Sequence, residues 1–118
     1  MGSGSGVGGA VKQSEVYWYT FRAPDKRRPV LILTRSSAIP FLTGITVAPI
    51  TTTIRGIPSE ILLTPDKDGV FADCAVNTDN IQTIQKANLG VFITQLSQER
   101  MREVRAAIEF SLGFDALL

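Results

Sequence analysis

The chain has 118 residues, 44% of them hydrophobic and 19% charged, and a formal net charge of +1; these values fit one small globular domain and exclude a multidomain enzyme. Its single cysteine and its lack of histidine exclude an internal disulfide and a zinc site of cysteine and histidine ligands, and they remove the commonest general base. It has no apolar run long enough to span a membrane and no basic segment followed by an apolar one at its start, so we expect a cytoplasmic protein.

The N-terminal segment, residues 1–10, is rich in glycine and serine and is expected to be a flexible linker, which leaves residues 11–118 as the folded domain. β-Branched and aromatic residues at 15–21, followed by a turn signal, predict a first strand. The short apolar run at 29–34 predicts a second strand that is covered on both faces.

A third strand is predicted at residues 45–52, where Pro49 cannot donate a ladder hydrogen bond and therefore favours a sheet edge or a bulge. Shorter elements follow in this order: strands at 60–63 and 70–77 around a turn at 65–69, a helical turn within 78–86, and a last strand at 89–95.

The C-terminal segment predicts an amphipathic helix over residues 98–112, with Ser97 as its N-cap and Gly113 after its end. An apolar stripe recurs at helical spacing and is expected to pack on the sheet: Met101, Val104, Ile108 and Leu112. Arg100 lies off this stripe with other charged residues and is predicted to be solvated. The elements together indicate a mainly β fold, a strongly bent antiparallel sheet or half-open barrel capped by this helix.

Charge is unevenly divided along the chain. Residues 16–56 carry six basic side chains and one acidic one, whereas residues 57–118 carry five basic and nine acidic ones. A basic first half on a nearly neutral protein indicates an anionic partner, with RNA or DNA favoured. A solvated surface of mixed charge is the alternative.

The densest basic cluster is Lys26-Arg27-Arg28, directly before Pro29. Proline forces Arg28 into an extended conformation at the start of a rigid strand. The planar fork of an arginine suits the extra negative charge of a pentacoordinate phosphorus. The competing interpretation is a charge that protects an aggregation-prone strand.

Two further segments carry polar side chains suited to nucleic acid. The third strand ends in threonines, where Thr51 and Thr53 share one face and Thr52 takes the other, and these hydroxyls are expected to position a phosphate rather than to act as nucleophiles. The loop at 73–83 is rich in amides that can read base edges. Asp73 and Asp79 in this loop suggest a magnesium pair, but capping roles are favoured. The aromatic run at 17–19, together with Phe21, offers a stacking surface, although alternate members must face the core.

Several segments in this order resemble the MazF/PemK toxins of bacterial toxin–antitoxin systems: E-V-Y-W at 15–18, K-R-R-P-V-L-I-L-T at 26–34, V-A-P-I-T-T-T-I-R-G-I-P-S-E-I at 47–61, D-C-A-V-N-T-D-N-I-Q-T-I at 73–84 and I-T-Q-L-S at 93–97. The resemblance implies an SH3-like β-barrel of short, mostly antiparallel strands that forms a homodimer. It implies a sequence-specific endoribonuclease, an mRNA interferase that cleaves single-stranded RNA without metal or cofactor by attack of the 2′-hydroxyl on the phosphate. A cognate MazE-like antitoxin, disordered and partly acidic, would neutralise it.

The resemblance also assigns residues to roles. The catalytic arginine of the R-P-V motif falls on Arg28, and the catalytic threonine that ends the third strand falls on Thr51. The expected RNA-binding residues are Arg27, Thr52, Thr53, Arg55, Asn80 and Thr83.

The chain departs from the family pattern at two places. Gln13-Ser14 stand where the family usually has R-G, and the loop at 21–27 is shorter than usual, so the target sequence cannot be carried over. Two other functions compete with this one. A non-catalytic SH3-like nucleic-acid-binding module is the main alternative, whereas a CcdB-like gyrase poison is disfavoured because its C-terminal tryptophan is missing and the only tryptophan is Trp18.

Overall fold

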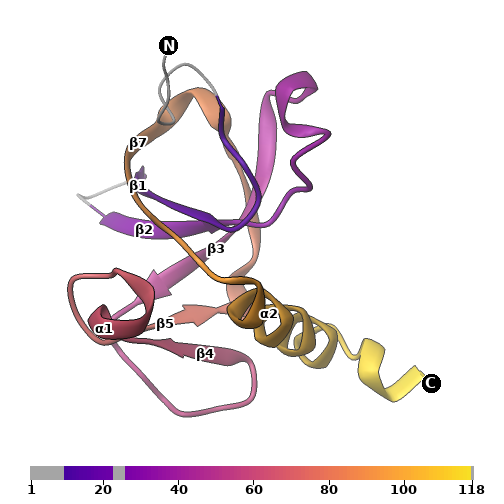
Figure 1. The fold of residues 1–118 in the computed structure, drawn as a ribbon. Coiled ribbons are helices and arrows are strands. Elements are labelled where there is room, and N and C mark those ends of the chain that lie inside the picture. The colour runs from indigo at the N-terminus through magenta and orange to yellow at the C-terminus, as the bar shows by residue number, and fades with distance from the viewer. Residues whose placement is uncertain (1–9, 23–25, 118) are drawn as a thin grey trace.

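The computed structural model describes residues 10–22 and 26–117 (Figure 1). Within these residues, strands β4-β5-β3-β2-β1-β7 form an antiparallel sheet in that order, and β6 pairs with β3 beside this path. The strands are β1 (Glu15–Phe21), β2 (Lys26–Ile32), β3 (Gly44–Thr51), β4 (Glu60–Leu63), β5 (Cys74–Asn77), β6 (Gln82–Gln85) and β7 (Leu89–Gln95). The helices are α1 (Pro65–Asp68) and α2 (Gln98–Ser111), with 3-10 turns η2 (Ile39–Phe41), η3 (Thr78–Asn80), η4 (Lys86–Asn88) and η5 (Phe114–Leu117).

The predicted fold class, a mainly β chain with a C-terminal helix, is confirmed. The strand path ends at β4 on one side and at β7 on the other, so the barrel is open. The linker predicted at the N-terminus falls almost entirely on residues 1–9, which lie outside the described residues. Among the residues that the structure describes, no helix is long and apolar enough to cross a membrane.

Strand β2 is covered on both faces, as its unbroken apolar run predicts. Leu31 belongs to a buried cluster with Val104 and Ala107 of α2, whereas Val30 and Ile32 belong to a second buried cluster on the opposite face of the strand. Because successive side chains of a strand point to opposite faces, β2 contributes to both halves of the core. The strand is thereby fixed in position along its length.

Several observed bounds differ from the predicted ones. Strand β2 begins at Lys26 rather than at residue 29, because its charged start pairs with β1, Arg28 opposite Tyr19. Strand β5 begins at Cys74 rather than at residue 70. The predicted turn at 65–69 is the one-turn helix α1, which ends at Gly69 with a φ of +75°. The region predicted as a helical turn contains η3 and also the strand β6.

Pro49 lies in the interior strand β3 rather than at a sheet edge. On one side of β3 it faces Val30 of β2. On the other side the partner of β3 changes, from β6 along residues 44–47 to β5 at residues 50 and 51. Pro49, which has no N–H to donate, stands between these two partners.

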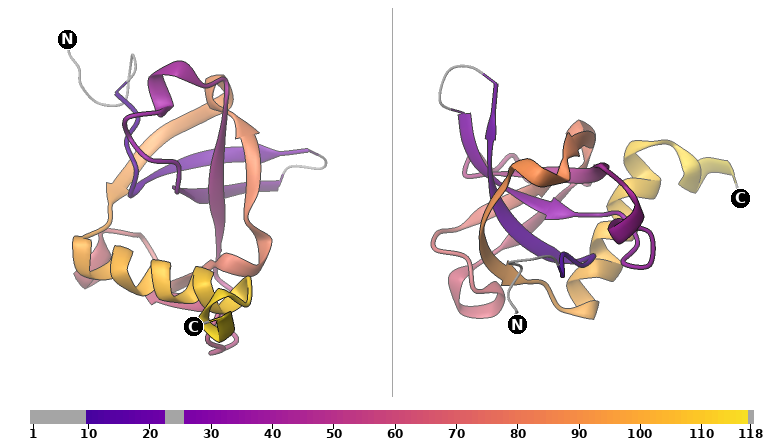
Figure 2. Two further views of the ribbon diagram at one scale, coloured as in Figure 1. Left: turned by 90° about the vertical axis from the view of Figure 1, so that its right-hand side faces the viewer. Right: turned by 90° about the horizontal axis from the view of Figure 1, so that it is seen from above.

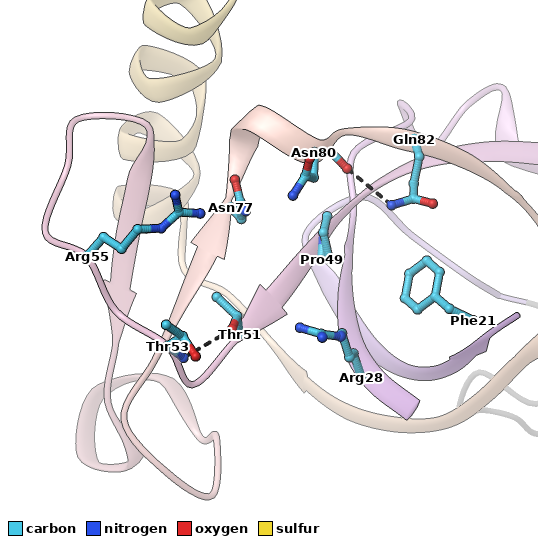
Figure 3. Close-up of a pocket in the computed structure, with 9 residues that line it drawn as sticks. All are labelled: Phe21, Arg28, Pro49, Thr51, Thr53, Arg55, Asn77, Asn80 and Gln82. Carbon is cyan, nitrogen blue, oxygen red and sulfur yellow. Dashed lines mark hydrogen bonds between the residues drawn. The ribbon is translucent and has the colours of Figure 1, made fainter. Parts of the chain in front are cut away.

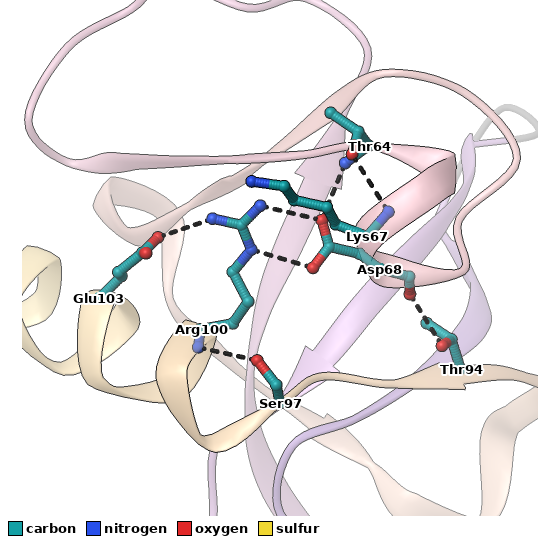
Figure 4. Close-up of polar contacts among 7 residues, drawn as sticks. All are labelled: Thr64, Lys67, Asp68, Thr94, Ser97, Arg100 and Glu103. Carbon is teal, nitrogen blue, oxygen red and sulfur yellow. Dashed lines mark hydrogen bonds and ion pairs between the residues drawn. The ribbon is translucent and has the colours of Figure 1, made fainter.

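Helix α2 starts as predicted, with the hydroxyl of Ser97 accepting from the Arg100 amide at 3.1 Å. Val104 and Ala107 are buried, but Leu112 is 55% exposed, so the apolar stripe ends before it. The prediction that Arg100 is solvated is wrong. Its Nε and Nη2 donate to the carboxylate of Asp68 at 2.9 and 3.2 Å, which ties α2 to α1 (Figure 4).

Candidate active site

The two strands that carry Arg28 and Thr51 are neighbours in the sheet. Strands β2 and β3 pair antiparallel with Val30 opposite Pro49. Extending this register by two residues along each strand brings Arg28 opposite Thr51, on the same face as Val30 and Pro49. The sheet therefore places the guanidinium and the hydroxyl side by side, although they are far apart in the sequence.

A groove of about 390 Å³ opens over this pair. Its lining residues are Phe21, Arg28, Pro49, Thr51, Thr53, Arg55, Asn77, Asn80 and Gln82. Figure 3 shows the Arg28 guanidinium extending toward Thr51, with Asn77 and Asn80 coming from the other side of the groove. A surface of arginines, hydroxyls and amides suits a phosphodiester with its bases.

The hydroxyl of Thr51 has a defined orientation. Its Oγ1 accepts a hydrogen bond from the backbone N–H of Thr53 at 3.0 Å. This bond engages one of the two lone pairs of the hydroxyl oxygen, and the O–H proton remains available to donate into the groove. The Thr51 hydroxyl is therefore suited to donate a hydrogen bond to a phosphate oxygen rather than to attack the phosphorus.

Arg28 is held by its strand and is partly buried. It lies opposite Tyr19 in β1, and Pro29 follows it in β2. Within the described residues its guanidinium forms no ion pair. The donors of Arg28 are therefore available to an anion in the groove.

Arg55 reaches the groove from the loop between β3 and β4, and Glu60 shapes that loop. The Glu60 side chain is only 3% exposed, and its Oε1 accepts from the amides of Arg55 and Gly56 at 2.9 and 3.1 Å. Its Oε2 has no hydrogen-bond partner among the described residues and faces the Arg55 Nε at 3.6 Å. Gly56 takes a φ of +68°, which glycine adopts without strain. Glu60 thus fixes the loop that presents Arg55.

The amide side of the groove is built on η3. The side chain of Asn77 caps this turn by accepting from the Asp79 amide at 2.9 Å. The carboxylate of Asp79 accepts from the Ser59 hydroxyl at 2.6 Å, which ties η3 to the start of β4. Gln82 Nε2 donates to the Asn80 carbonyl at 3.3 Å. Asp79 therefore has a structural contact, although the residue that caps η3 is Asn77 rather than Asp79.

The structure brings most of the predicted residues together. Arg28, Thr51, Thr53, Arg55 and Asn80 line the groove described above. A second cavity of about 360 Å³ shares Arg28, Thr51 and Thr53 with it and is also lined by Arg27 and Thr52.

Thr83 differs from the other predicted RNA-binding residues. It lies in β6 opposite Thr46 and lines neither cavity. Three further residues line the groove that were not among the predicted RNA-binding residues: Phe21, Asn77 and Gln82. The sequence signals for them were the aromatic stacking surface for Phe21 and the amide-rich loop for Asn77 and Gln82.

The described residues contain no group of three or more histidine, cysteine, aspartate or glutamate side chains placed to hold a metal ion. Cys74 lines a separate, small cavity of about 40 Å³. It is buried and is not poised for chemistry. Burial, together with the carboxylates of Asp68 and Asp73, raises the pKa of its thiol to about 11.

Comparisons with known proteins agree on one family. A family model described as the PemK-like, MazF-like toxin of type II toxin–antitoxin systems matches residues 12–112. The chain is 40% identical over 100 residues to a probable endoribonuclease, MazF5, of Mycobacterium tuberculosis, covering 85% of this chain and 91% of the relative. It is 50% identical over 91 residues to the endoribonuclease MazF3 of the same species, covering 77% and 87%.

Solved structures give the same result. The Mycobacterium tuberculosis toxin MazF-mt6 is similar with a TM-score of 0.76 and 37% identity, covering 84% of this chain and 96% of that one. An endoribonuclease in complex with its cognate antitoxin, from a mycobacterial species, is similar with a TM-score of 0.78 and 26% identity, covering 88% and 96%.

Proposed function

The chain belongs to the PemK/MazF toxin family of type II toxin–antitoxin systems, and on this premise we propose that it is a sequence-specific endoribonuclease, an mRNA interferase that cleaves single-stranded RNA. Relatives named as endoribonucleases favour this function over a non-catalytic nucleic-acid-binding module and over a gyrase poison. The observation that carries the proposal is that Arg28 and Thr51 line one groove together with several amide side chains.

The proposed reaction is a transesterification within the RNA chain. The ribose 2′-hydroxyl gives its proton to a solvent water molecule and attacks the adjacent phosphorus, the bond from phosphorus to O5′ breaks, and O5′ takes a proton from water. The products are a 2′,3′-cyclic phosphate and a 5′-hydroxyl end. Holding the 2′-oxygen in line with the leaving oxygen supplies much of the rate enhancement.

Arg28 and Thr51 have different parts in this scheme. The guanidinium of Arg28 stabilises the negative charge that develops on the phosphorane and assists the departing O5′. The O–H of Thr51 donates to a non-bridging oxygen and so orients the phosphate. Arg27, Thr52, Thr53, Arg55 and Asn80 hold the flanking nucleotides. Thr83 stays a predicted RNA contact, at a distance from the groove.

The test is cleavage of a long single-stranded RNA in excess EDTA, with the ends of the fragments mapped. We expect cuts at one sequence with 5′-hydroxyl ends. Removing one such electrostatic contact costs about 10²–10³ in rate, so Arg28→Ala and Thr51→Ala should lose activity on this scale. Arg105→Ala, on the exposed side of α2, is the matched control. No cleavage by the unmodified chain would leave the non-catalytic nucleic-acid-binding module as the better function.

We further propose a MazE-like antitoxin and a second copy of the chain as partners. An acidic antitoxin segment would be complementary to the basic groove, and a similar protein has been solved with its cognate antitoxin. Exposed apolar side chains near the C-terminus support a homodimer: Phe110, Leu112 and Phe114. Sedimentation showing only monomer at micromolar concentration would contradict the dimer. An mRNA substrate places the proposed activity in the cytoplasm.

A further inference from the structure

Strands β1 and β2 form an arm whose two faces differ in chemistry. Figure 2 shows this hairpin projecting from the rest of the sheet. Side chains alternate along each strand, so Trp18 and Arg27 share one face, whereas Tyr19, Phe21 and Arg28 share the other. The groove with the amides lies on the face of Phe21 and Arg28. The opposite face carries a separate surface.

The second cavity lies on the face of Trp18 and Arg27. Its lining residues are Trp18, Arg27, Arg28, Pro29, Ile50, Thr51, Thr52, Thr53 and Phe71. It shares Arg28, Thr51 and Thr53 with the amide-lined groove. The two cavities therefore meet at the candidate catalytic pair, one on each side of it.

An aromatic pair dominates this second cavity. Trp18 and Phe71 are stacked, with ring centroids 5.5 Å apart and an angle of 29° between their planes. The guanidinium carbon of Arg27 lies 4.1 Å from the centroid of the Trp18 ring. Phe71 is 69% exposed, so one of the largest apolar side chains remains open to solvent beside the catalytic pair.

These three side chains combine what a nucleotide needs. A nucleobase can stack on an exposed aromatic ring, and a neighbouring arginine can donate hydrogen bonds to the phosphate. Phe71 comes from the segment between α1 and β5, far along the sequence from Trp18 and Arg27. The residue directly before it, Val70, is buried and anchors this segment to the core. The position of the ring is therefore set by the core.

We propose that Phe71, Trp18 and Arg27 form a stacking subsite for one nucleobase of single-stranded RNA, directly beside the scissile phosphate. The subsite rests on the proposed function. The RNA chain crosses the arm at Arg28 and Thr51, with one flanking base on the aromatic side and the other on the amide side. Stacking accepts any base, so the aromatic side contributes affinity, whereas the amide side carries sequence selectivity.

The kinetic test uses the RNA that the unmodified chain cleaves, and versions of it with one abasic residue at each position around the cut. Stacking on an aromatic side chain is worth about 1–3 kcal/mol per base, so Phe71→Ala should lower kcat/KM by roughly 5- to 150-fold. Phe71→Tyr should stay close to the unmodified chain. Phe41→Ala, which removes a ring that is 86% exposed in η2, is the matched control.

The abasic RNAs locate the base. At one position, directly beside the cut, the abasic RNA should be cleaved as slowly by the unmodified chain as intact RNA is by Phe71→Ala, and on that RNA Phe71→Ala should have no further effect. At the other positions, the loss of cleavage rate caused by the abasic residue and the loss caused by Phe71→Ala should add.

A binding measurement gives a second readout. Trp18 is the only tryptophan of the chain, so its fluorescence reports on this surface alone. Titration with RNA that carries a 2′-O-methyl group on the attacking ribose should quench Trp18 emission. The RNA that is also abasic at the identified position should quench it much less.

The outcomes separate the subsite from the proposed function. Cleavage by the unmodified chain with unchanged kinetics in Phe71→Ala overturns the subsite and leaves the nuclease intact. If Phe71→Ala cleaves normally but binds the antitoxin more weakly, the surface belongs to the protein partner and the subsite is again overturned. If the unmodified chain does not cleave RNA at all, the proposed nuclease function itself is wrong.

Discussion

Ser14 takes a left-handed backbone conformation with a φ of +80°, the only residue other than glycine to do so among those described. It stands where the MazF/PemK pattern has the glycine of R-G. Its backbone joins two strands, since its amide donates to the Ile32 carbonyl at 3.0 Å and its carbonyl accepts from Leu96 at 2.9 Å. These backbone hydrogen bonds hold Ser14 in the left-handed conformation, although glycine is the residue that adopts it without strain.

This conformation makes Ser14→Gly and Ser14→Ala a sensitive pair. Left-handed backbone costs a residue with a Cβ roughly 1–2 kcal/mol. Both substitutions remove the hydroxyl that accepts from Gln95 Nε2 at 3.0 Å. Ser14→Gly should therefore be more stable than Ser14→Ala by about 1 kcal/mol in urea unfolding, after allowing for the entropy of glycine. Alanine equal to or better than glycine would show that the backbone is not strained here.

Cys74 should be inert in the folded chain. Burial, with the nearby carboxylates of Asp68 and Asp73, raises its pKa from 9.0 to about 11, and only the thiolate reacts readily. At pH 8 a thiol reagent should label Cys74 only after urea unfolds the chain. The raised pKa means that the folded state holds the thiol proton more tightly, so this contribution to stability is complete below pH 9 and is lost as the pH rises toward 11. Rapid labelling of the folded chain would contradict this.

At the scale of elements, α1 and α2 are held together by one buried ion pair. The Asp68 side chain is 2% exposed and accepts from the Thr64 amide at 2.9 Å, as well as from Arg100. Arg100 also donates to Glu103 at 3.0 Å, but Glu103 is 45% exposed (Figure 4). The same guanidinium therefore makes one buried contact and one exposed contact.

The two contacts of Arg100 should differ sharply in their effect on stability. Asp68→Asn removes a buried carboxylate from a partly buried guanidinium, which keeps only the exposed Glu103 as a charge partner, and should lower the free energy of unfolding by about 2–3 kcal/mol. Glu103→Gln removes an exposed pair and should change it by less than about 1 kcal/mol. Urea unfolding of both variants measures this difference. Equal effects would mean that Asp68 and Arg100 are solvated in solution.

Element by element, the sequence predicts what is local and misses what depends on pairing. The apolar patterns predict β1, β4 and β7 at their observed bounds. Strand β6 has one buried apolar residue, Ile84, and becomes a strand because it pairs with β3. The charged start of β2 likewise becomes strand by pairing with β1.

The candidate site follows the same rule. Arg28 and Thr51 could be predicted from motif order, and the register of β2 and β3 explains why they meet. Asn77 and Phe71 could not, because their places in the two cavities depend on how η3 and the segment after α1 pack. The prediction that Arg100 is solvated fails for a similar reason, because its partner Asp68 lies 32 residues away in the sequence.

Over the whole molecule, the net charge of +1 conceals a division of charge. The basic residues of the cavities, Arg27, Arg28 and Arg55, come from the first half of the chain. On α2, two of the three arginines are paired with acidic residues, Arg100 with Asp68 at 2.9 Å and Arg105 with Glu109 at 3.4 Å. The basic side chains of the candidate site therefore lie in one region. The affinity for RNA should fall with salt only as steeply as a few arginine–phosphate contacts predict.

This division makes Arg55 and Arg105 a matched pair for measuring that dependence. Both are exposed arginines paired with a glutamate, at 3.6 and 3.4 Å, but only Arg55 lines a cavity.

For single strands, log K falls with log salt by about 0.7 per phosphate contact, so the three cavity arginines predict a slope of roughly −2. Binding of a 2′-O-methyl RNA, followed by anisotropy across salt concentrations, should show this slope. Arg55→Ala should reduce its magnitude by about 0.7, because one counterion-releasing contact is lost, whereas Arg105→Ala should leave it unchanged. Equal changes in both variants would mean that the RNA responds to total charge rather than to this groove.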